Sequence, residues 1–370
     1  MIPSATTAGE LQLAVVGFGR LGRDYYLPAL RMLGGVRVVA VVDPLLESRR
    51  SAAKRLPEAE IYADHHLMLD AMRLDGVLVV SPPSTHLEIW TATTGHGIPT
   101  FVEKPLVLSS QLSRLETQAQ NPRVMIDFNR RFWPTYNRAR DLLRQGVLGM
   151  PVRFEFTLHL NVPRWSSVTR HRLDPNEGGV LHDLGCHAID LAIQIIGEEP
   201  DTVAAVTTTQ QWTGDRLELR LVFPSGSSAN CDLAYGDRTR ERLVVCGPQG
   251  RLRLEEPNMA LHVEQEGARQ LPVVAWLRDG AQLGYRGLRR SQSMGQASIR
   301  NALAAFLYCL KSSAPFAPGY VDGVRNAMWV AAAERSTASA GRSQRAGDTS
   351  ASLQRTPIAF AEVKQESNED

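Results

Sequence analysis

The chain has 370 residues, 43% hydrophobic and 22% charged, which is typical of a globular protein with more than one domain. Its net charge of +2 gives no electrostatic case for binding nucleic acid or a membrane, and a small neutral or anionic ligand fits better. Four scattered cysteines without CxxC spacing predict reduced thiols, and no stretch resembles a signal peptide or a membrane span. We therefore expect a cytoplasmic protein with no nucleic-acid or membrane partner.

After a flexible N-terminus (1–10), residues 11–128 alternate short apolar runs with helical segments. Apolar runs of this length are typical of strands buried on both faces, and their alternation with helices favours right-handed βαβ units. The sequence therefore predicts an α/β domain with a doubly wound parallel (Rossmann) sheet. The expected strands are Leu11–Val16, Val36–Val42, Gly76–Val80 and Ile98–Val102, and the helical segments include Leu21–Leu33 and Leu45–Leu56.

The motif Gly17-Phe18-Gly19-Arg20-Leu21-Gly22 ends the first expected strand and opens the first helix. In that context the GxGxxG spacing is typical of a dinucleotide-binding turn, in which the glycines permit the tight turn, the approach of a pyrophosphate and close helix packing. Asp43 ends the next strand, about 20 residues later, at the position of an acid that binds a ribose 2′-hydroxyl. This pattern favours NAD, while Arg49 and Arg50 leave NADP as an alternative.

Two further turns stand at the carboxyl ends of expected parallel strands, where ligands bind in open α/β sheets. Ser81-Pro82-Pro83-Ser84-Thr85-His86 follows the strand that ends at Val80, and Glu103-Lys104-Pro105 follows the strand that ends at Val102. We expect the first turn to line the nicotinamide half of the cofactor. Taken alone, the first is also typical of a helix N-terminus and Lys104 of a solvated surface lysine.

A second domain is expected over 129–340, where after Gly149 strand segments alternate apolar with mostly polar residues, as is typical of an antiparallel sheet covered on one side. We expect an α+β domain with a large open, mainly antiparallel sheet, whose free face is a surface for a homodimer or homotetramer. A late amphipathic helix is expected at about Gln296–Leu310, and 341–370 is expected to be a disordered tail. The expected strands include Val152–Leu160, Val203–Gln210, Leu217–Phe223, Ala229–Ala234 and Arg242–Val245.

Asp183 and His187 lie four residues apart after a glycine pair, so on an α-helix they would share one face and the carboxylate could orient the imidazole. His187 could then act as a general base, with Lys104 stabilising a developing alkoxide. A histidine satisfied by Asp183 without catalytic duty is one alternative. A zinc site that uses His182 and Cys186 is another, but its ligand spacing is not typical, and we expect no metal.

The segment 161–177 carries residues typical of a substrate loop, or equally of an ordinary solvated loop. Trp165 can stack on a sugar face, and arginines such as Arg164, Arg170 and Arg172 can hold a phosphate or a carboxylate, which favours a phosphorylated, nucleotide-linked or acidic substrate over a plain sugar. His159 and Asn161, two residues apart on one strand face, are weaker candidates for the same pocket.

Five segments occur in the order found in the glucose-fructose oxidoreductase/inositol dehydrogenase/rhizopine catabolism (Gfo/Idh/MocA) family of NAD(P)-dependent oxidoreductases, and the chain resembles that family from about Leu11 through the late helix. The segments are the glycine motif, residues 81–86, Glu103-Lys104-Pro105, Asn129-Arg130-Arg131-Phe132 and residues 178–197. The resemblance implies that Lys104, Asp183 and His187 are catalytic. It also implies a cofactor site with Gly17, Phe18, Gly19, Arg20, Asp43, Ser81, His86 and Glu103, to which Leu21, Gly22, Pro82, Pro83 and Lys104 are added from the same turns.

The arginine pair resembles the inositol dehydrogenase version of its segment, which implies that Arg130 faces the substrate. The expected substrate site is then Lys104, Arg130, His159, Asn161, Trp165, Arg172, Asp183 and His187. We interpret the chain as an NAD(P)-dependent oxidoreductase that moves a hydride between nicotinamide and a secondary hydroxyl of a sugar, cyclitol or nucleotide-sugar. Two alternatives are an NAD-dependent enzyme that cleaves a glycoside through transient oxidation and a non-catalytic regulator that senses NAD or a sugar.

Overall fold

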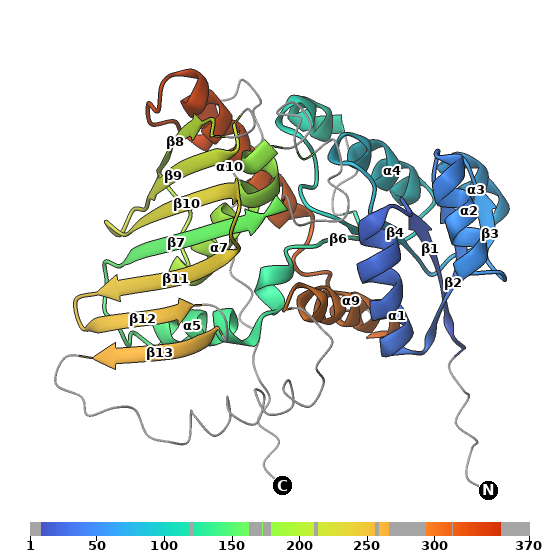
Figure 1. Cartoon of the computed structure of the whole chain (residues 1–370), viewed down its shortest axis with the longest axis horizontal. Coiled ribbons are helices and arrows are strands. Elements are labelled where there is room, and N and C mark those ends of the chain that lie inside the picture. Colours follow the sequence, from blue (N-terminus) through green and yellow to red (C-terminus); the bar gives the residue numbers. More distant parts are fainter. Residues whose placement is uncertain are drawn as a thin grey trace, which may run out of the picture.

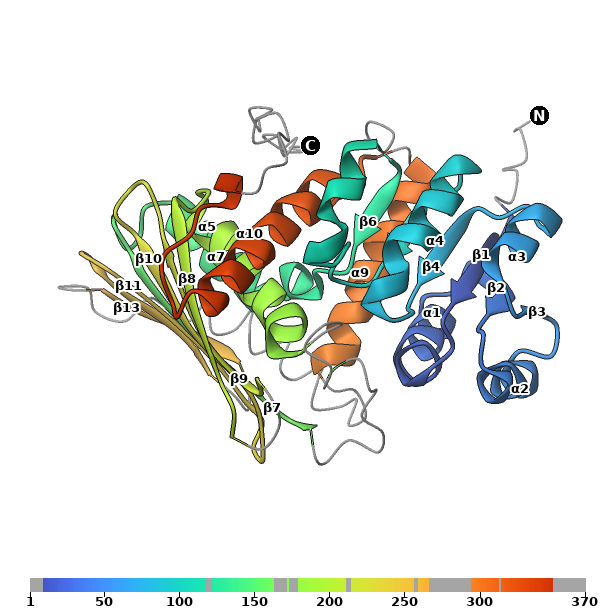
Figure 2. The same cartoon turned by 90° about the horizontal axis from the view of Figure 1, so that it is seen from above.

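Two sheets lie side by side in the computed structural model, with helices between and around them (Figures 1 and 2). The structure describes residues 9–117, 122–162, 172, 179–210, 214–255, 259–265, 294–312 and 314–348. One sheet is parallel and the other mixed but mainly antiparallel, which confirms the predicted fold class. Among the helices of the described residues, none combines the length and apolar character needed to cross a bilayer.

The first sheet has six parallel strands in the order β3-β2-β1-β4-β5-β6. The four expected strands are present, and two three-residue strands that the sequence did not predict, β3 and β6, form its edges. The strands are β1 (Leu11–Val16), β2 (Val36–Val42), β3 (Glu60–Tyr62), β4 (Gly76–Val79), β5 (Thr100–Val102) and β6 (Val124–Ile126). The helices around them are α1 (Leu27–Leu33), α2 (Leu46–Arg55), α3 (His65–Ala71), α4 (Pro83–Gly95) and α9 (Met294–Ser312).

Helices cover both faces of this sheet, which is why its strands are apolar at consecutive positions. Leu13 and Val15 pack with α1 and α9, whereas Ala14 and Val16 pack with α3, α4 and part of α10 (Tyr320–Ala338). The apolar stripe of α9 is buried in this core, with Leu303 and Phe306 fully covered. The chain therefore returns to the first domain after the second, although α9 lies within the range 129–340 assigned to the second domain from sequence.

The second sheet has the order β13-β12-β11-β7-β10-β9-β8, with β7 and β10 parallel and the other pairs antiparallel. Within the described residues, helices cover one of its faces, the one turned toward the first domain (Figure 2). Its strands are β7 (Arg153–Asn161), β8 (Thr202–Thr208), β9 (Arg216–Val222), β10 (Ser228–Gly236), β11 (Arg240–Gly247), β12 (Gly250–Glu255) and β13 (Ala260–Gln265), and the helices are α5 (Pro134–Arg144), α7 (Cys186–Ile196) and α10.

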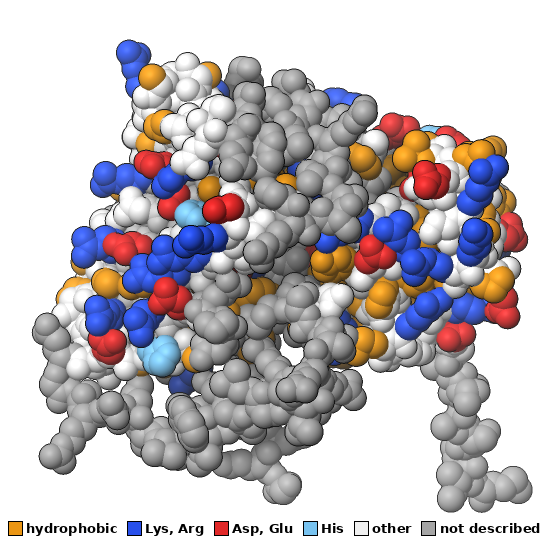
Figure 3. Space-filling model, in the orientation of Figure 1, with side chains coloured by type: hydrophobic (Ala, Val, Ile, Leu, Met, Phe, Trp, Pro, Cys, Tyr) orange, Lys and Arg blue, Asp and Glu red, His pale blue; other side chains and the backbone are white. Residues whose placement is uncertain are grey.

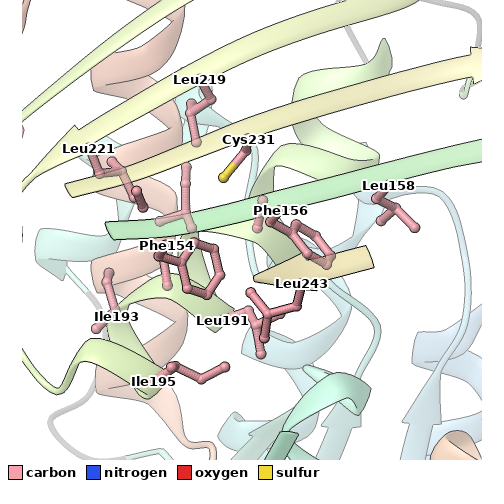
Figure 4. Close-up of a cluster of buried hydrophobic side chains, with 14 of the residues drawn as sticks. Phe154, Phe156, Leu158, Leu191, Ile193, Ile195, Leu219, Leu221, Cys231 and Leu243 are labelled. Atoms are coloured by element: carbon pink, nitrogen blue, oxygen red, sulfur yellow. The ribbon is translucent and has the colours of Figure 1, made fainter. Parts of the chain in front are cut away.

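Alternation decides which side chains of this sheet enter the core. Phe154, Phe156 and Leu158 of β7 point toward Leu191 and Ile195 of α7, as Figure 4 shows. The residues between them on β7 lie on the opposite, uncovered face. Helix α10 contributes to both cores and therefore joins the two sheets.

The segment that follows α10 is attached to the second sheet, which differs from the tail expected from Gly341. Gln344 exchanges backbone hydrogen bonds with Val203 of β8 at 2.8 and 2.9 Å, and Arg335 donates to the carbonyl of Arg345. The segment 341–348 is therefore part of the folded domain. The rest of the expected tail, 349–370, lies outside the described residues, as does most of the expected N-terminus.

Candidate functional site

The glycine turn follows β1, and each of its three glycines meets different surroundings. Gly17 has a φ of +95°, and a Cβ there would lie 2.7 Å from backbone atoms of Val80 and Ser81. A Cβ on Gly22 would lie 2.5 Å from the carbonyl oxygen of Gly17, whereas a Cβ on Gly19 would meet no atom within 4 Å. Packing within the chain requires the first and third glycines, so the open space at Gly19 fits a ligand that approaches the backbone.

Asp43 ends β2 and is held against the glycine turn. Its Oδ2 accepts a hydrogen bond from the amide of Phe18 at 2.8 Å, and its Oδ1 accepts one from the amide of Leu45 at 2.9 Å. Each carboxylate oxygen has a second lone pair, which leaves capacity for the two hydroxyls of a ribose. Arg49 donates to the carbonyls of Asp43 and Pro44, so its guanidinium is held by backbone oxygens beside this carboxylate.

The other residues expected around a cofactor fall into two groups. Ser81 and Pro82 lie at the surface of the turn after β4, and Arg20 and Leu21 are partly exposed beside Gly19. The side chain of Phe18 is buried in the core, and Pro83 is buried at the start of α4. Phe18 and Pro83 therefore support the turns by packing in the protein interior.

His86 is fully buried, with Nδ1 at 2.7 Å from the carbonyl oxygen of Pro105 and Nε2 at 3.0 Å from that of Ser81. Both turns thus contact one buried imidazole; because burial lowers the pKa of His86, the ring is neutral and its single N–H donates to one of the two carbonyl oxygens. His86 therefore positions Ser81 and the Lys104 segment.

The carboxyl end of β5 brings Lys104 to the second domain. Its Nζ lies 2.5 Å from Oδ1 of Asp183 and donates at 2.9 Å to the backbone carbonyl of the same residue. Both side chains are about 10% exposed. Burial acts to lower the pKa of Lys104, but the adjacent Asp183 carboxylate more than offsets it and the pKa is raised, so the ammonium is charged at neutral pH.

Asp183 is the most heavily bonded residue of the site. Its Oδ2 accepts hydrogen bonds from Arg172 at 2.6 Å and from the phenol of Tyr235 at 2.8 Å, in addition to the contact of Oδ1 with Lys104. Although burial opposes ionisation, the charges of Arg172 and Lys104 lower the pKa of Asp183 far below its usual range. The carboxylate is therefore ionised and fixes Lys104 at the interface between the two domains.

His187 lies one turn further along, on α7, and is 6% exposed. Burial, together with the charges of Arg130 and Lys104, lowers its pKa well below 6.5, so the imidazole is neutral at physiological pH. Within the described part of the chain, its Nδ1 has no hydrogen-bond partner. A neutral imidazole near a charged lysine can accept a proton from a hydroxyl that lies between them.

The expected hydrogen bond between Asp183 and His187 is not what the structure shows. Leu181–Gly185 forms a π-helical turn (η5), closed by the bond from the amide of Cys186 to the carbonyl of Leu181. This turn contains one residue more than an α-helical turn, so side chains four apart no longer lie one above the other. Asp183 consequently faces Lys104 and Arg172, and it does not share one helix face with His187 as the four-residue spacing predicted.

Arg130 and Arg131 follow β6 and bind carboxylates of the second domain. Arg130 forms a two-point ion pair with Glu241 at 3.0 and 3.4 Å, and Tyr136 donates to the same carboxylate at 2.6 Å. Arg131 binds Asp190 and Asp322. The charge of Arg130 is thus balanced inside the protein, although it still acts on His187.

Two expected substrate residues, His159 and Asn161, have contacts away from Lys104. Because Tyr235 faces Asp183 and pairs in register with Leu160, His159 lies on the opposite face of the sheet, where its Nε2 is 3.1 Å from Asp232. The amide of Asn161 donates to the carbonyl of Asp237. Trp165 and most of the expected loop lie outside the described residues.

The residues of the alternative zinc site have other partners. Cys186 donates to the carbonyl of His182, whose ring lies 3.2 Å from Glu334, and Asp183 is bound as described above. In the described ranges, the group that brings three potential metal-ligand atoms within 4.8 Å of one another is His65, His66 and Glu88, on α3 and α4.

Sequence reasoning missed Tyr235, Glu241 and Asp127, which all contact residues of this site. Tyr235 and Glu241 lie on β10 and β11 and reach the site because helix α7 packs on this sheet. The position of Asp127 could have been predicted, because this residue follows a short apolar run just as Glu103 does. That run is three residues long, which is too short to be recognised as a strand with confidence from periodicity.

Comparison with known proteins agrees with this architecture. Residues 11–126 match the family described as "Oxidoreductase family, NAD-binding Rossmann fold", and residues 136–253 match the "GFO/IDH/MocA C-terminal domain". The chain is 29% identical to scyllo-inositol 2-dehydrogenase (NAD(+)) of Bacillus subtilis over 199 residues, which span 53% of this chain and 56% of that protein. It is 27% identical to inositol 2-dehydrogenase 2 of Saccharopolyspora erythraea over 80% of this chain and 88% of that protein.

Solved structures share the fold over nearly the whole chain. An oxidoreductase from Agrobacterium radiobacter, solved with NAD+, L-tartaric acid and magnesium, has a TM-score of 0.75 at 19% identity and covers 91% of this chain and 99% of that one. The WlbA dehydrogenase from Bordetella pertussis, solved with NADH and UDP-GlcNAcA, has a TM-score of 0.77 at 16% identity and covers 92% and 99%. At these identities the likeness shows the fold alone.

Proposed function

Because the chain belongs to the GFO/IDH/MocA family of oxidoreductases and has an NAD-binding Rossmann domain, we propose that it is an NAD-dependent dehydrogenase acting on a secondary hydroxyl of a neutral polyol such as a cyclitol or sugar. The observation that carries the proposal is the position of Lys104. It lies at the carboxyl end of β5, beside the cofactor turns, and is held as a cation by Asp183. The inositol dehydrogenases among the relatives support the choice of a cyclitol.

The residues present fit a dinucleotide. The open approach at Gly19, the amides that begin the first helix and the carboxylate of Asp43 would hold the pyrophosphate and the adenosine ribose. The turns that carry Ser81 and Lys104 would lie at the nicotinamide end. The bound cofactor supplies hydride-transfer chemistry, and the protein supplies position and charge.

On the side of the substrate, Lys104 would donate a hydrogen bond to the reacting hydroxyl oxygen and stabilise its negative charge as the proton leaves. His187, neutral and buried, would accept that proton and return it in the direction of reduction. Asp183 would act through Lys104 by keeping the ammonium charged and in place. Burial of both side chains keeps water from competing for these contacts.

The pairing of two arginines, Arg130 and Arg172, supports a neutral substrate; Arg164 and Arg170 lie outside the described residues. Arg130 and Arg172, which could have held a phosphate or carboxylate, are bound by Glu241 and Asp183 within the described residues. An acidic substrate would have to displace one of these buried carboxylates, which is costly. These pairings favour inositols and hexoses over nucleotide-linked acids.

The test is a substrate panel with NAD: scyllo-inositol, myo-inositol, neutral hexoses, hexose phosphates and a UDP-hexuronate, with NADH followed by absorbance. We expect NADH to accumulate with one neutral polyol and to match the keto product in amount. Consumption of a glycoside without net NADH would instead support transient oxidation. Binding of NAD and a sugar with no turnover of any panel member would support the regulator.

We also propose that the uncovered face of the second sheet pairs with a second copy of the chain. Acidic and basic side chains alternate across it (Figure 3), around a hollow of about 470 Å³ lined by residues that include Glu155, Glu218, Arg220 and Arg242. Such a mixed surface can be complementary to itself across a two-fold axis. Light scattering on the purified protein tests this, and Arg220→Glu should shift a dimer or tetramer toward monomer.

The cytoplasmic location expected from sequence is supported by four free cysteines.

A further inference from the structure

Behind Lys104, three acidic groups from three parts of the first domain meet in the core. Tyr26 ends the π-helical turn η1 (Gly22–Tyr26), Glu103 directly follows β5, and Asp127 directly follows β6. Because β5 and β6 are paired neighbours with Val102 opposite Ile126, the two carboxyl groups leave the sheet side by side. Tyr26 and Asp127 are completely buried and Glu103 is 7% exposed.

The phenol of Tyr26 lies between the two carboxyl groups. Its oxygen is 2.7 Å from Oε1 of Glu103 and 2.6 Å from Oδ2 of Asp127. A phenol carries one hydrogen and can donate to only one of these oxygens. The other short contact therefore needs a hydrogen from the carboxyl group itself.

The surroundings identify which carboxyl group carries that hydrogen. Oδ1 of Asp127 is buried and has no hydrogen-bond partner in the described part of the protein, which is costly for an ionised carboxylate. Oε2 of Glu103, by contrast, lies 3.2 Å from the backbone amide of Lys104, which can donate to it. Burial raises the pKa of both groups, and the adjacent Glu103 carboxylate raises that of Asp127 further, so that the pKa of Asp127 lies well above its usual range.

We propose that Asp127 is a neutral acid at physiological pH, that it donates to Tyr26, and that Tyr26 donates to an ionised Glu103. The three groups then hold two protons and one negative charge, and the charge lies at the Glu103 end, next to Lys104. Asp127 is a positioning residue that acts through Tyr26 on Glu103. None of the three needs a proton from the reaction, so the arrangement persists through the catalytic cycle.

A fixed negative charge at this place has a consequence for the cofactor. Glu103 stands at the carboxyl end of β5, where the proposed function puts the nicotinamide, and the oxidised ring is positively charged whereas the reduced ring is neutral. The charge should therefore favour binding of NAD+ over NADH. This consequence rests on the proposed function, whereas the protonation of Asp127 does not.

The protonation state is tested on the protein without any cofactor or substrate. A protonated carboxyl group gives an infrared carbonyl-stretch band that a carboxylate lacks, and an ordinary aspartic acid is fully ionised at about pH 8. We expect such a band at that pH in the wild-type protein and in the control Glu58→Gln, which removes an exposed carboxylate. Asp127→Asn should lose the band while unfolding at nearly the wild-type temperature, because an amide can donate to Tyr26 as the acid does. Absence of the band in wild type, or its persistence in Asp127→Asn, would overturn the proposal.

The location of the charge is tested by calorimetric binding of NAD+ and NADH. Glu103→Gln should shift the ratio of the two affinities toward NADH by roughly threefold or more, as expected for loss of one charge at short range. Asp127→Asn should leave the ratio unchanged. An equal shift in both variants would mean that Asp127 is ionised, and an unchanged ratio in Glu103→Gln would place the charge elsewhere. Failure of the protein to bind either cofactor would count against the proposed function and not against the infrared result.

Discussion

At the proposed cofactor end of the site, the glycine turn meets Asp43 only 25 residues after Phe18, and most contacts involve the backbone. At the proposed catalytic end, Lys104 meets Asp183 across 79 residues and between two domains, and ion pairs between buried side chains hold the site together. The first end therefore depends on local conformation and the second on long-range ion pairs. Substitutions should affect binding at one end and turnover or stability at the other.

The largest effect is expected at the catalytic end. Lys104→Ala and His187→Ala should each lower kcat by roughly 100-fold or more, because positioned charge and general base catalysis each contribute about that much. NAD affinity should change little in His187→Ala. Lys54→Ala, which removes an exposed lysine of α2, is the control. Wild-type turnover by both variants on a confirmed substrate would show that the reacting groups lie elsewhere.

Asp183→Asn tests the ion pairs that join the domains. Two buried cations, Lys104 and Arg172, would lose their counter-charge, and breaking a buried pair costs about 3 kcal/mol of unfolding free energy. Chemical denaturation measures this. Asp24→Asn removes a surface partner of Arg23 and should cost less than about 1 kcal/mol. Equal losses of unfolding free energy in the two variants would show that Asp183 contributes no more to stability than a surface carboxylate does.

Asp43→Ala tests the cofactor end. We expect the NAD dissociation constant to rise by roughly tenfold or more, since a charge-assisted hydrogen bond contributes about 1.5 to 3 kcal/mol. Turnover at saturating NAD should stay near that of wild type. Calorimetry with NAD and NADP gives the comparison, and equal affinity of the wild-type protein for both cofactors would refute the role of Asp43 in selection.

The glycines allow a finer comparison within the same turn. Gly19→Ala should weaken NAD binding and leave the thermal unfolding temperature unchanged, because an added Cβ meets only open space. Gly17→Ala should lower that temperature as well, because it combines a positive φ with a clash against Val80 and Ser81. If Gly19→Ala bound NAD like wild type, the pyrophosphate would not approach at this point.

The smallest expected effect concerns pH. Since burial and the neighbouring cations lower the pKa of His187, kcat should fall on the acid side only below 6.5, the ordinary value for histidine. Below pH 6.5 the unfolded chain binds a proton at His187 more readily than the folded chain does. This residue should therefore also reduce stability as the pH falls below 6.5. Arg130→Gln removes one of the cations and should move the acid limb of kcat to higher pH. If the acid limb of the kcat profile stayed at the same pH in that variant, Arg130 would not influence the pKa of His187.

The difference between the two ends also sets how far sequence reasoning could go. The glycine turn, Asp43 and Lys104 were predicted from residue types at strand ends, because a parallel sheet brings those ends together at one edge. The role of Asp183 as the partner of Lys104 was not predicted. It depends on the extra residue in the turn 181–185, and a π-helical turn is stabilised by surrounding packing and not by a recognisable local sequence.

The sequence by itself determined the two sheets, from continuous apolar runs in the first and apolar–polar alternation in the second, together with the glycine turn after β1 and the apolar stripe of α9. Only the tertiary structure decided that α9 packs on the first sheet, that His159 faces away from Lys104, and that Tyr26 lies between Glu103 and Asp127. These outcomes depend on which distant surfaces meet. Local periodicity fixes which face of an element is apolar, but not which other element covers it.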